Sequence, residues 1–498
     1  MTSTFLIGLI LVVLFLSWWR KRNQFLPPGP WNIPIIGSLF WLDPKKPYKT
    51  LHDFAKRYGP IYGLYMGGIY TVVLSDAKLI KKVLSKEATT GRAPLYITHG
   101  LMKGCGIICA EGPLWKDQRK LLFNFLRNIG AAKVSTKRTA MENSILKHVD
   151  GFIDYIESVG QSPNFSPLEH LRHTIGSFMN EIVFGESWSK DDKTWIYLQH
   201  LQEEGIKYIG IAGPVNFLPI LRFLPIFRKN LKFLQDGLET THKLYDEIIA
   251  NHRKTLKQQL DENPDFEPQN LLDTFLLEKK KKENTPEGLF YNDQQLRYLL
   301  ADVFGAGLDT TLTTLSWYLL FMSLHEDFQQ LVREELASVL QGRRPTMVDF
   351  QELPLFEASI AEVQRVRSTV PVGIPHGTIA PIEIEGFQIP KETMIIPLQW
   401  SVHMDEKKWR DPEIFDPKRF LDENVSFCRS ENFIPFQAGK RICIGDELAK
   451  MLLYLFASTI LQKYRLSIDS RENVNLDGHC GITLSPESFK ITFENFQA

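Results

Sequence analysis

One cysteine near the C-terminal end sets the strongest condition on how this chain can fold. Cys443 lies in the run Phe-Gln-Ala-Gly-Lys-Arg-Ile-Cys-Ile-Gly at residues 436–445, which reads as a glycine-punctuated loop ahead of a helix that starts near Asp446. The partially positive N-terminus of a helix favours a thiolate, as a bound metal would. Gly439 and Gly445 let the backbone turn and let a large group approach closely. The run therefore predicts a thiolate beside a bulky partner.

Two further side chains in the same run indicate what this partner is. Phe436 offers a flat apolar face, and Arg441 offers a forked donor for a carboxylate. A flat macrocycle with carboxylate tails and a thiolate-ligated metal at its centre uses all of these features, and haem is such a group. The alternative is that Cys443, between Ile442 and Ile444, is only a small buried hydrophobic residue, as free cysteines commonly are.

The complete pattern Phe-x-x-Gly-x-Arg-x-Cys-x-Gly resembles the haem-binding motif of the cytochrome P450 family. The resemblance implies a mainly α-helical fold with small β-sheets, in which haem b lies between a long central helix and the cysteine loop. It implies that Cys443 is the axial iron ligand, and that Phe436, Gly439 and Arg441 contact the cofactor.

Composition agrees with a large folded body and argues against some other classes. A chain of 498 residues with 44% hydrophobic content can bury one large core or two smaller ones. The formal net charge is zero, which argues against nucleic-acid binding. The five cysteines are odd in number and show no Cys-x-x-Cys spacing, so they do not indicate a disulfide framework or a structural metal site. A reducing compartment fits this usage.

The N-terminus, residues 1–22, is expected to be an uncleaved membrane anchor. Residues 5–19 are almost entirely apolar, and Arg20-Lys21-Arg22 follow. As a helix the apolar run reaches only about 22 Å, and the Trp18-Trp19 pair extends it as an interfacial belt. A cleaved signal peptide is the competing interpretation, although no basic residue precedes the run and no cleavage site follows it. The positive flank predicts a cytosolic body, and the resemblance implies the endoplasmic reticulum membrane.

A proline-rich segment, Pro27-Pro28-Gly29-Pro30, follows this anchor. It cannot be helical, and it predicts a stiff hinge over residues 23–36 that holds the body off the membrane. The remaining residues, 37–498, are expected to form a single haem-thiolate monooxygenase domain.

Residue patterns predict several elements of this domain. Residues 61–65 and 69–74 are expected to pair as a hairpin, Ser75 to cap the next helix, and residues 382–397 to form another small sheet. The charge run from Lys279 to Lys282 is expected to be a solvated loop, because like charges repel.

The longest predicted helix runs from an Asn292 cap to about Leu324, roughly 50 Å, and carries Ala-Gly-Leu-Asp-Thr-Thr at 306–311. A glycine inside a helix costs about 1 kcal/mol, and threonine can bond back to the carbonyl four residues earlier and open the helix. A core helix with a glycine for close packing is the alternative. The run matches the P450 oxygen-activation motif. That resemblance implies that Thr310 stabilises bound dioxygen and that Asp309 helps to deliver protons.

Three charged residues are expected to support the fold rather than the chemistry. Glu362 and Arg365 are spaced as an ion pair on one helix, and Arg419 lies in the downstream run Pro-Lys-Arg-Phe. The pair alone is equally typical of a solvated helix face. The resemblance implies a buried cluster of all three, in which loss of one member strands the others at a cost of several kcal/mol.

Three residues outside the cysteine loop are candidate contacts to the carboxylate tails of haem. Trp115 and Arg119 lie one helical turn apart on one face, and His376 follows Ile374-Pro375. Each alone is typical of an ordinary polar contact. With Arg441, the resemblance implies three cations that converge on two carboxylates.

The substrate is expected to be apolar. Residues 206–227 are rich in Ile, Leu, Phe and Pro, and are expected to cover the pocket or to dip into a bilayer. Ile107, Ile108, Val370 and Val372 are candidate pocket walls.

Electrons are expected to come from a partner protein. The chain shows no glycine-rich strand-to-helix fingerprint, so no dinucleotide-binding domain is expected. The resemblance implies NADPH–cytochrome P450 reductase as the donor. A basic face that meets the reductase could include Lys116, Lys120, Arg127 and Lys440, although an ordinary solvated surface is the alternative for each.

The resemblance implies a membrane-bound monooxygenase that uses O2 to hydroxylate an apolar substrate. Two wider stretches, residues 106–112 and 370–377, look like the arthropod ecdysteroid 25-hydroxylases of the phantom type. That resemblance implies a sterol ketodiol as substrate and its C25 alcohol as product. Juvenile-hormone epoxidases, other steroid hydroxylases and xenobiotic enzymes are alternatives from the same branch. A haem-thiolate isomerase that needs no electrons and a haem-binding sensor are alternatives from other classes.

Overall fold

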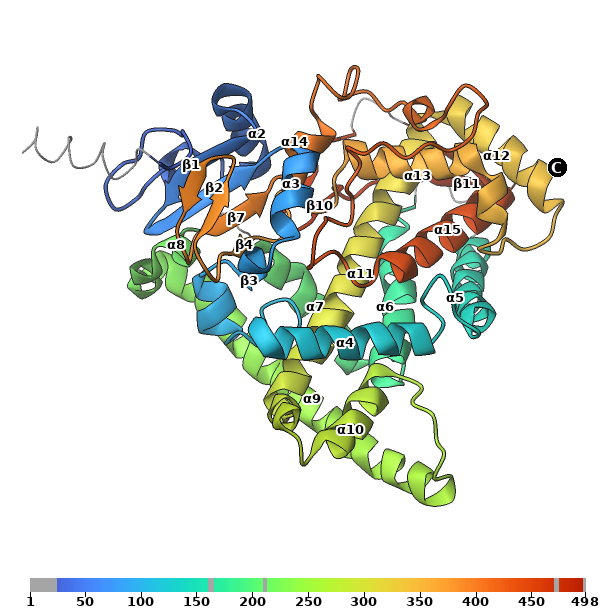
Figure 1. Ribbon diagram of the computed structural model, residues 1–498. Helices are drawn as coiled ribbons and strands as arrows, with labels where there is room; N and C mark the ends of the chain where they lie inside the picture. Colours follow the sequence, from blue (N-terminus) through green and yellow to red (C-terminus); the bar gives the residue numbers. More distant parts are fainter. Residues whose placement is uncertain (1–24, 160–164, 209–212, 470–473, 496–498) are drawn as a thin grey trace, which may run out of the picture.

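Helices dominate the computed structural model, which describes residues 25–159, 165–208, 213–469 and 474–495 (Figure 1). The predicted fold, mainly helical with small sheets, is confirmed. The helices are α2 Pro47–Tyr58, α3 Ala77–Leu84, α4 Gly112–Asn128, α5 Arg138–Val159, α6 Leu168–Phe184, α7 Lys193–Tyr208, α8 Pro214–Phe217, α9 Pro225–Glu262, α10 Leu271–Lys282, α11 Asp293–Leu324, α12 Glu326–Leu340, α13 Pro354–Val366, α14 Gln399–His403 and α15 Asp446–Lys463.

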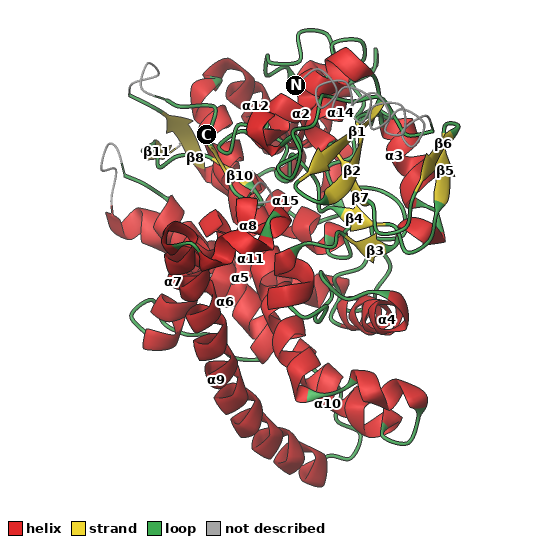
Figure 2. Cartoon of the chain, turned by 90° about the vertical axis from the view of Figure 1, so that its left-hand side faces the viewer, coloured by secondary structure: helices red, strands yellow, loops and turns green. Residues whose placement is uncertain are grey.

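The strands form one five-stranded sheet and three pairs. The large sheet has the order β1-β2-β7-β4-β3, and the pairs are β5-β6, β8-β11 and β9-β10. Figure 2 shows the large sheet and the β5-β6 pair on one side of the helical body and the β8-β11 pair on the other. The strands are β1 Ile61–Met66, β2 Ile69–Leu74, β3 Gly91–Arg92, β4 His376–Gly377, β5 Ile382–Ile384, β6 Phe387–Ile389, β7 Met394–Pro397, β8 Tyr464–Ser467, β9 His479–Cys480, β10 Leu484–Ser485 and β11 Thr492–Asn495.

The predicted hairpin is confirmed, and the predicted sheet at residues 382–397 is only partly correct. β1 and β2 pair antiparallel from Ile61 opposite Leu74 to Met66 opposite Ile69. β5 and β6 pair with each other, but β7 joins the large sheet by pairing parallel to β2. β7 is buried at every position, because it is an inner strand of that sheet.

α11 is the central helix, as predicted. Its N-cap is Asn292, whose side chain accepts a hydrogen bond from the backbone N–H of Gln295 at 2.9 Å. Most of its residues are buried, and Figure 1 shows it running through the middle of the body next to α6 and α15. A helix apolar on all sides is expected at such a position.

Two local predictions were wrong. The cap of α3 is Asp76 rather than Ser75, because the Asp76 carboxylate accepts from the backbone N–H of Leu79 at 2.8 Å. The Lys279–Lys282 run is the last turn of α10 rather than a loop. Lysines at a helix C-terminus interact favourably with the helix dipole, which offsets their mutual repulsion.

The proline-rich segment lies against the sheet. Pro28 O accepts from the backbone N–H of Gly63 at 2.8 Å, and Phe25 O accepts from Gln388 at 2.9 Å. A Cβ on Gly29 would lie only 1.6 Å from Gly63 O, so the contact requires glycine. The predicted anchor lies outside the described residues. Within the described ranges, no helix is both long enough and apolar enough to cross a bilayer.

Candidate active site

The cysteine loop ends where α15 begins, as predicted. The backbone N–H of Cys443 donates to Phe436 O at 3.1 Å and closes the loop, and Gly445 is the N-cap of α15. The Cys443 side chain has accessible surface, yet burial raises the pKa of its thiol to about 11. The sulfur therefore faces a space that is enclosed by protein, where an anion is poorly solvated.

The helix N-terminus does not by itself make this sulfur a thiolate. The backbone N–H of Gly445 and the cation of Arg119 lower the pKa of Cys443, but desolvation outweighs them. A metal bound to a cysteine sulfur displaces the thiol proton. The environment of Cys443 thus suits a ligated thiolate rather than a free one.

Gly439 serves the loop by packing against α3. Its φ is +78°, and a Cβ there would lie 2.3 Å from the carbonyl oxygen of Leu84. Lys440 donates its backbone N–H to the same oxygen at 3.0 Å. The close approach that this glycine permits is therefore to the body of the protein, which fixes the loop in place. Phe436 is half-buried, with Lys450 Nζ 5.7 Å from its ring centre.

The middle of α11 also borders an open space. Residues 311–323 are buried, whereas Ala306, shortly before them, is exposed. Thr310 Oγ1 donates to Ala306 O at 2.7 Å, which is the back-bond expected from the sequence. Asp309 Oδ2 accepts from Thr483 Oγ1 at 2.8 Å, and burial raises the pKa of this carboxyl. The predicted alcohol and acid thus lie beside the exposed part of the helix.

Predicted cofactor contacts gather around one indole ring. The guanidinium of Arg441 lies 4.5 Å from the ring centre of Trp115, and that of Arg119 lies 6.0 Å from it. Arg119 donates to the carbonyl of Ile442 at 2.8 Å. The donors of Arg441 reach three backbone carbonyls, those of Thr90, Ile108 and Ala110. Both arginines are therefore hydrogen-bonded to neutral oxygens, and among the described residues no carboxylate forms an ion pair with either.

His376 lies buried at this site, and its contact to a haem carboxylate stays a prediction. The residue is 3% exposed, and its Nδ1 donates to Thr89 O at 2.8 Å. Burial and, less strongly, the neighbouring Arg92 lower its pKa to about 3. The ring is neutral with its proton on Nδ1, so Nε2 is an acceptor.

Arg92 is a cation of this site that the sequence analysis missed. It pairs with His376 across β3 and β4, and its Nε donates to Ile108 O at 2.6 Å. Its Nη1 is buried and has no hydrogen-bond partner among the described residues. In the sequence it is a lone arginine between Gly91 and Ala93. Such a local pattern does not predict that it pairs with a strand far away in the chain.

The cation cluster is suited to an anion with more than one carboxylate. Burial, with smaller contributions from Arg92 and Arg119, lowers the pKa of Arg441 to about 8. The nearby carboxylate of Glu111 already accepts the backbone N–H of Arg92. Buried cations need anionic partners, and the unpartnered Nη1 of Arg92 is an available donor. The residues present therefore fit haem, whose propionates are such partners.

The three structural charges form the predicted buried cluster. Arg365 donates twice to the carboxylate of Glu362, at 2.7 Å each, and Arg419 Nε donates to the same carboxylate at 3.0 Å. Arg365 also donates to His403 O, and Asp416 N–H donates to Glu362. These contacts join α13 to the segment that precedes the cysteine loop. Each charge has close partners, as a buried ion cluster requires.

A second buried carboxylate holds the predicted pocket wall. Asp302 Oδ2 accepts the backbone N–H groups of Ile107 and Ile108 at 2.7 and 2.8 Å, and Gln295 forms two hydrogen bonds with Gly106. Burial raises the pKa of Asp302 to about 7. The sequence analysis missed both α11 residues, although an acid one turn before the Ala-Gly run was a usable signal.

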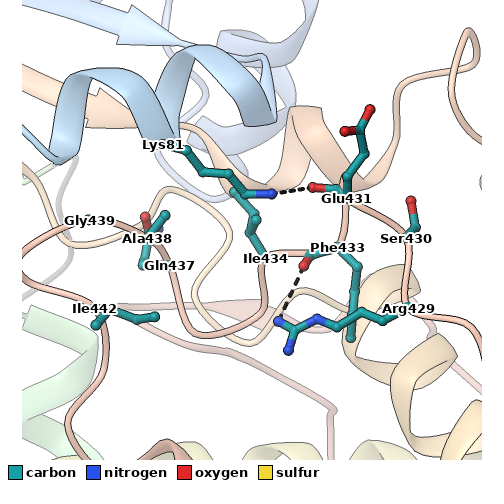
Figure 3. Close-up of a pocket in the computed structure, with 10 residues that line it drawn as sticks. All are labelled: Lys81, Arg429, Ser430, Glu431, Phe433, Ile434, Gln437, Ala438, Gly439 and Ile442. Carbon is teal, nitrogen blue, oxygen red and sulfur yellow. Dashed lines mark hydrogen bonds between the residues drawn. The ribbon is translucent and has the colours of Figure 1, made fainter.

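A hollow of about 360 Å³ on the protein surface lies beside the cysteine loop. Figure 3 shows Lys81 and Arg429 at its rim, with Ala438, Gly439 and Ile442 of the loop beside them. Lys81 donates to Glu431 O at 2.6 Å. The predicted basic residues Lys116, Lys120, Arg127 and Lys440 are all exposed. Lys116 and Lys440 both contact Glu87 at 2.6 Å.

Comparison with known proteins agrees with this site. Residues 27–493 match the family model of cytochrome P450. Cytochrome P450 306a1 of Drosophila melanogaster is 37% identical, over 99% of this chain and 93% of its own length. Cytochrome P450 18a1 of the same organism is 33% identical, over 97% and 90%. Cytochrome P450 2J3 of Rattus norvegicus is 32% identical, over 95% and 92%.

The site fits a haem bound through a cysteine, and the family match gives the same class, a haem-thiolate protein. The chain belongs to the cytochrome P450 family and is a cytochrome P450 monooxygenase. Its cofactor is haem, whose iron is ligated by a cysteine in this family.

Proposed function

We propose that Cys443 is the thiolate ligand of the haem iron, and that Arg92, Arg119, Arg441 and Trp115 hold the propionate side. The observation that carries this assignment is the enclosed sulfur of Cys443 at the start of α15, beside a buried cation cluster with an unpartnered donor. Bound there, haem activates O2, which is the chemistry that thiolate ligation favours.

The acid and the alcohol of α11 serve proton delivery. Monooxygenation consumes O2, two electrons and two protons, and releases the alcohol product and water. Thr310 Oγ1 lies on a helix turn that borders the open space, and the preceding residue, Asp309, is hydrogen-bonded to Thr483. A carboxyl group whose pKa is raised by burial exchanges protons nearer to neutral pH than a solvated one does.

The substrate is apolar, and we propose a steroid of the ecdysteroid-precursor type, hydroxylated at C25. Two stretches support this choice, because both look like the ecdysteroid 25-hydroxylases. Ile107 and Ile108 of the first stretch are fixed against α11 by Asp302, and Val372 of the second is buried in the core. Rigid apolar walls favour a rigid apolar ligand, since little freedom is lost on binding.

Other activities predict different results in the same assay. A juvenile-hormone or xenobiotic monooxygenase would oxidise other members of a substrate panel. A haem-thiolate isomerase or a haem-binding sensor would show no NADPH-dependent turnover, and the Asp309–Thr310 pair argues against the isomerase.

Electrons are supplied by NADPH–cytochrome P450 reductase at the face that carries the cysteine loop. This face combines the exposed basic residues with the hollow beside Ile442, which is itself 38% exposed (Figure 3). A basic rim around an accessible loop favours an acidic partner and speeds its docking at low salt.

Association with the endoplasmic reticulum membrane completes the proposal, with residues 1–22 as anchor and residues 37–498 as the catalytic domain. Large apolar side chains are exposed at two neighbouring places, near Trp31 and Phe40 and on the 3₁₀ helix Pro219–Phe223. Gly67 joins them, because its N–H donates to Ile36 O and a Cβ on it would lie 2.4 Å from Phe217 O. Exposed apolar patches of this kind are typical of membrane contact.

The test is a reduced carbon-monoxide difference spectrum, followed by a sterol panel with purified reductase. We expect a red-shifted thiolate band and NADPH-dependent conversion of the ketodiol to its C25 alcohol, identified by mass spectrometry. A histidine-like band would refute the ligand assignment. A thiolate band with oxidation of other panel members only would refute the steroid assignment and leave the ligand assignment intact.

A further inference from the structure

The turn between β9 and β10 is fastened to α11 close to the acid. Trp317 Nε1 donates to Leu484 O at 2.7 Å, and a Cβ on Gly478 would lie 2.8 Å from the ring of Trp317. Thr483, in the same turn, donates its hydroxyl hydrogen to Asp309 Oδ2 at 2.8 Å. The turn therefore has both a backbone attachment to α11 and a separate, side-chain attachment to the acid.

Threonine hydroxyl groups add further contacts between α11 and the segments around this turn. Thr314 Oγ1 donates to Thr310 O at 2.9 Å, and it lies 2.9 Å from Thr369 Oγ1. A hydroxyl has one hydrogen to donate, so Thr369 is the donor to Thr314. Thr369 O in turn accepts the backbone N–H of Leu484 at 2.9 Å. The turn is thus held in register with α11 by contacts that do not involve Thr483.

The carboxyl of Asp309 is held at one oxygen only. Oδ2 accepts from Thr483, whereas Oδ1 has no hydrogen-bond partner among the described residues. The charged group that faces it is Arg172 of α6, which is itself paired with Glu203 of α7 at 2.9 Å. Thr483 is 2% exposed, so no water competes for its hydroxyl from bulk solvent.

We propose that Thr483 is a positioning residue for the monooxygenase reaction, because its hydroxyl fixes Asp309 Oδ2 and leaves Oδ1 as the oxygen that exchanges protons. This inference rests on the proposed role of Asp309 in proton delivery. A hydrogen bond to a carboxylate is stronger than one between neutral groups, and it is strong enough to select one rotamer of a partly enclosed side chain.

The comparison of Thr483→Val with Thr483→Ser separates positioning from packing. Valine keeps the shape and removes the donor, whereas serine keeps the donor and loses a methyl group. Both variants keep the attachments at Trp317 and Thr369, so haem content and melting temperature should report whether the turn stays folded. All kinetic results are normalised to the carbon-monoxide signal.

The first measurement is an infrared pH titration of the Asp309 carboxyl in the haem-loaded protein, assigned by its loss in Asp309→Asn. A donor stabilises the carboxylate, so its removal raises the pKa. We expect the midpoint in Thr483→Val to rise by about one to two pH units, and that in Thr483→Ser to stay near the wild-type value. Equal midpoints in wild type and Thr483→Val would overturn the inference.

The second measurement is product formed per NADPH, with reductase and the panel sterol of highest turnover. We expect a severalfold fall in Thr483→Val, recovery in Thr483→Ser, and no further fall when Thr483→Val is added to Asp309→Asn. An equal fall in the Asp309→Asn background would make Thr483 purely structural. If Asp309→Asn alone leaves coupling unchanged, the proposed role of Asp309 fails as well, and the two failures are thereby distinguished.

Discussion

Two regions of the molecule treat buried charge in opposite ways. Around Glu362 the carboxylate receives hydrogen bonds from Arg365, Arg419 and a backbone N–H, so its charge is matched on several sides. In α11, Asp302 has two backbone donors and Asp309 has one hydroxyl, and burial raises the pKa of both. The first arrangement joins α13 to the segment before the cysteine loop, and the second leaves two acids whose pKa is raised above the usual range. Buried charges with a full set of partners typically stabilise the fold, whereas buried acids with few partners and a raised pKa are typical of functional sites.

The largest effect should come from Cys443, the proposed haem ligand in the cysteine loop. We expect Cys443→Ala to lose the thiolate-type carbon-monoxide band completely, because no other sulfur is held in this loop. Difference spectra and haem content of the purified variant measure this. Cys428→Ala, which removes an exposed cysteine elsewhere, is the control and should keep the band. A thiolate band that survives in Cys443→Ala would show that the ligand assignment is wrong.

The second largest effect should come from removing one charge from the buried cluster around Glu362. Arg365→Met leaves Glu362 buried without its main partner, and breaking a buried pair costs about 3–5 kcal/mol. We expect a lower melting temperature and weak haem retention, measured by thermal unfolding and the haem-to-protein ratio.

A matched control is the exposed pair of Lys56 and Glu406, at 2.8 Å. Lys56→Met makes the same chemical change on the surface, where an ion pair contributes about 0–1 kcal/mol. If Arg365→Met and Lys56→Met lowered the melting temperature by similar amounts, the buried cluster would contribute no more stability than a surface ion pair.

How far the sequence predicts these regions depends on the range of the contacts. The α11 cap at Asn292 and the back-bond of Thr310 are local, so residue patterns were sufficient. The place of β7 in the large sheet and the partnership of Arg92 with His376 join segments far apart in the chain, and no local pattern specifies them. Burial lowers the pKa of His376, and residue type alone does not reveal that burial.

Asp302 should make stability depend on pH. Its folded pKa, about 7, exceeds the unfolded value of 3.8, so the folded state keeps a proton that the unfolded state has lost between these values. Stability therefore falls as pH rises from about 4 to about 7, by ~4 kcal/mol at most. Asp302→Asn keeps an acceptor oxygen without the charge and should remove this slope. Melting temperatures of both proteins from about pH 5 to about pH 8 measure it. Parallel curves would show that the carboxyl is ionised throughout.

The smallest effect should come from Thr310 on α11, where a substitution should change the reaction but not the fold. Thr310→Ala removes a hydroxyl whose one hydrogen-bond partner among the described residues is Ala306 O, so folding and the carbon-monoxide band should be preserved. A positioned proton-transfer group contributes at least about 100-fold, so product formation should fall by about that factor while NADPH is still consumed and peroxide is released. Thr310→Ser retains the hydroxyl and should recover most of the product. Product, NADPH and peroxide are measured together with reductase. If Thr310→Ala couples like the wild type with every accepted substrate, the open face of α11 is a binding surface only, and the contrast between the two regions reduces to one of stability.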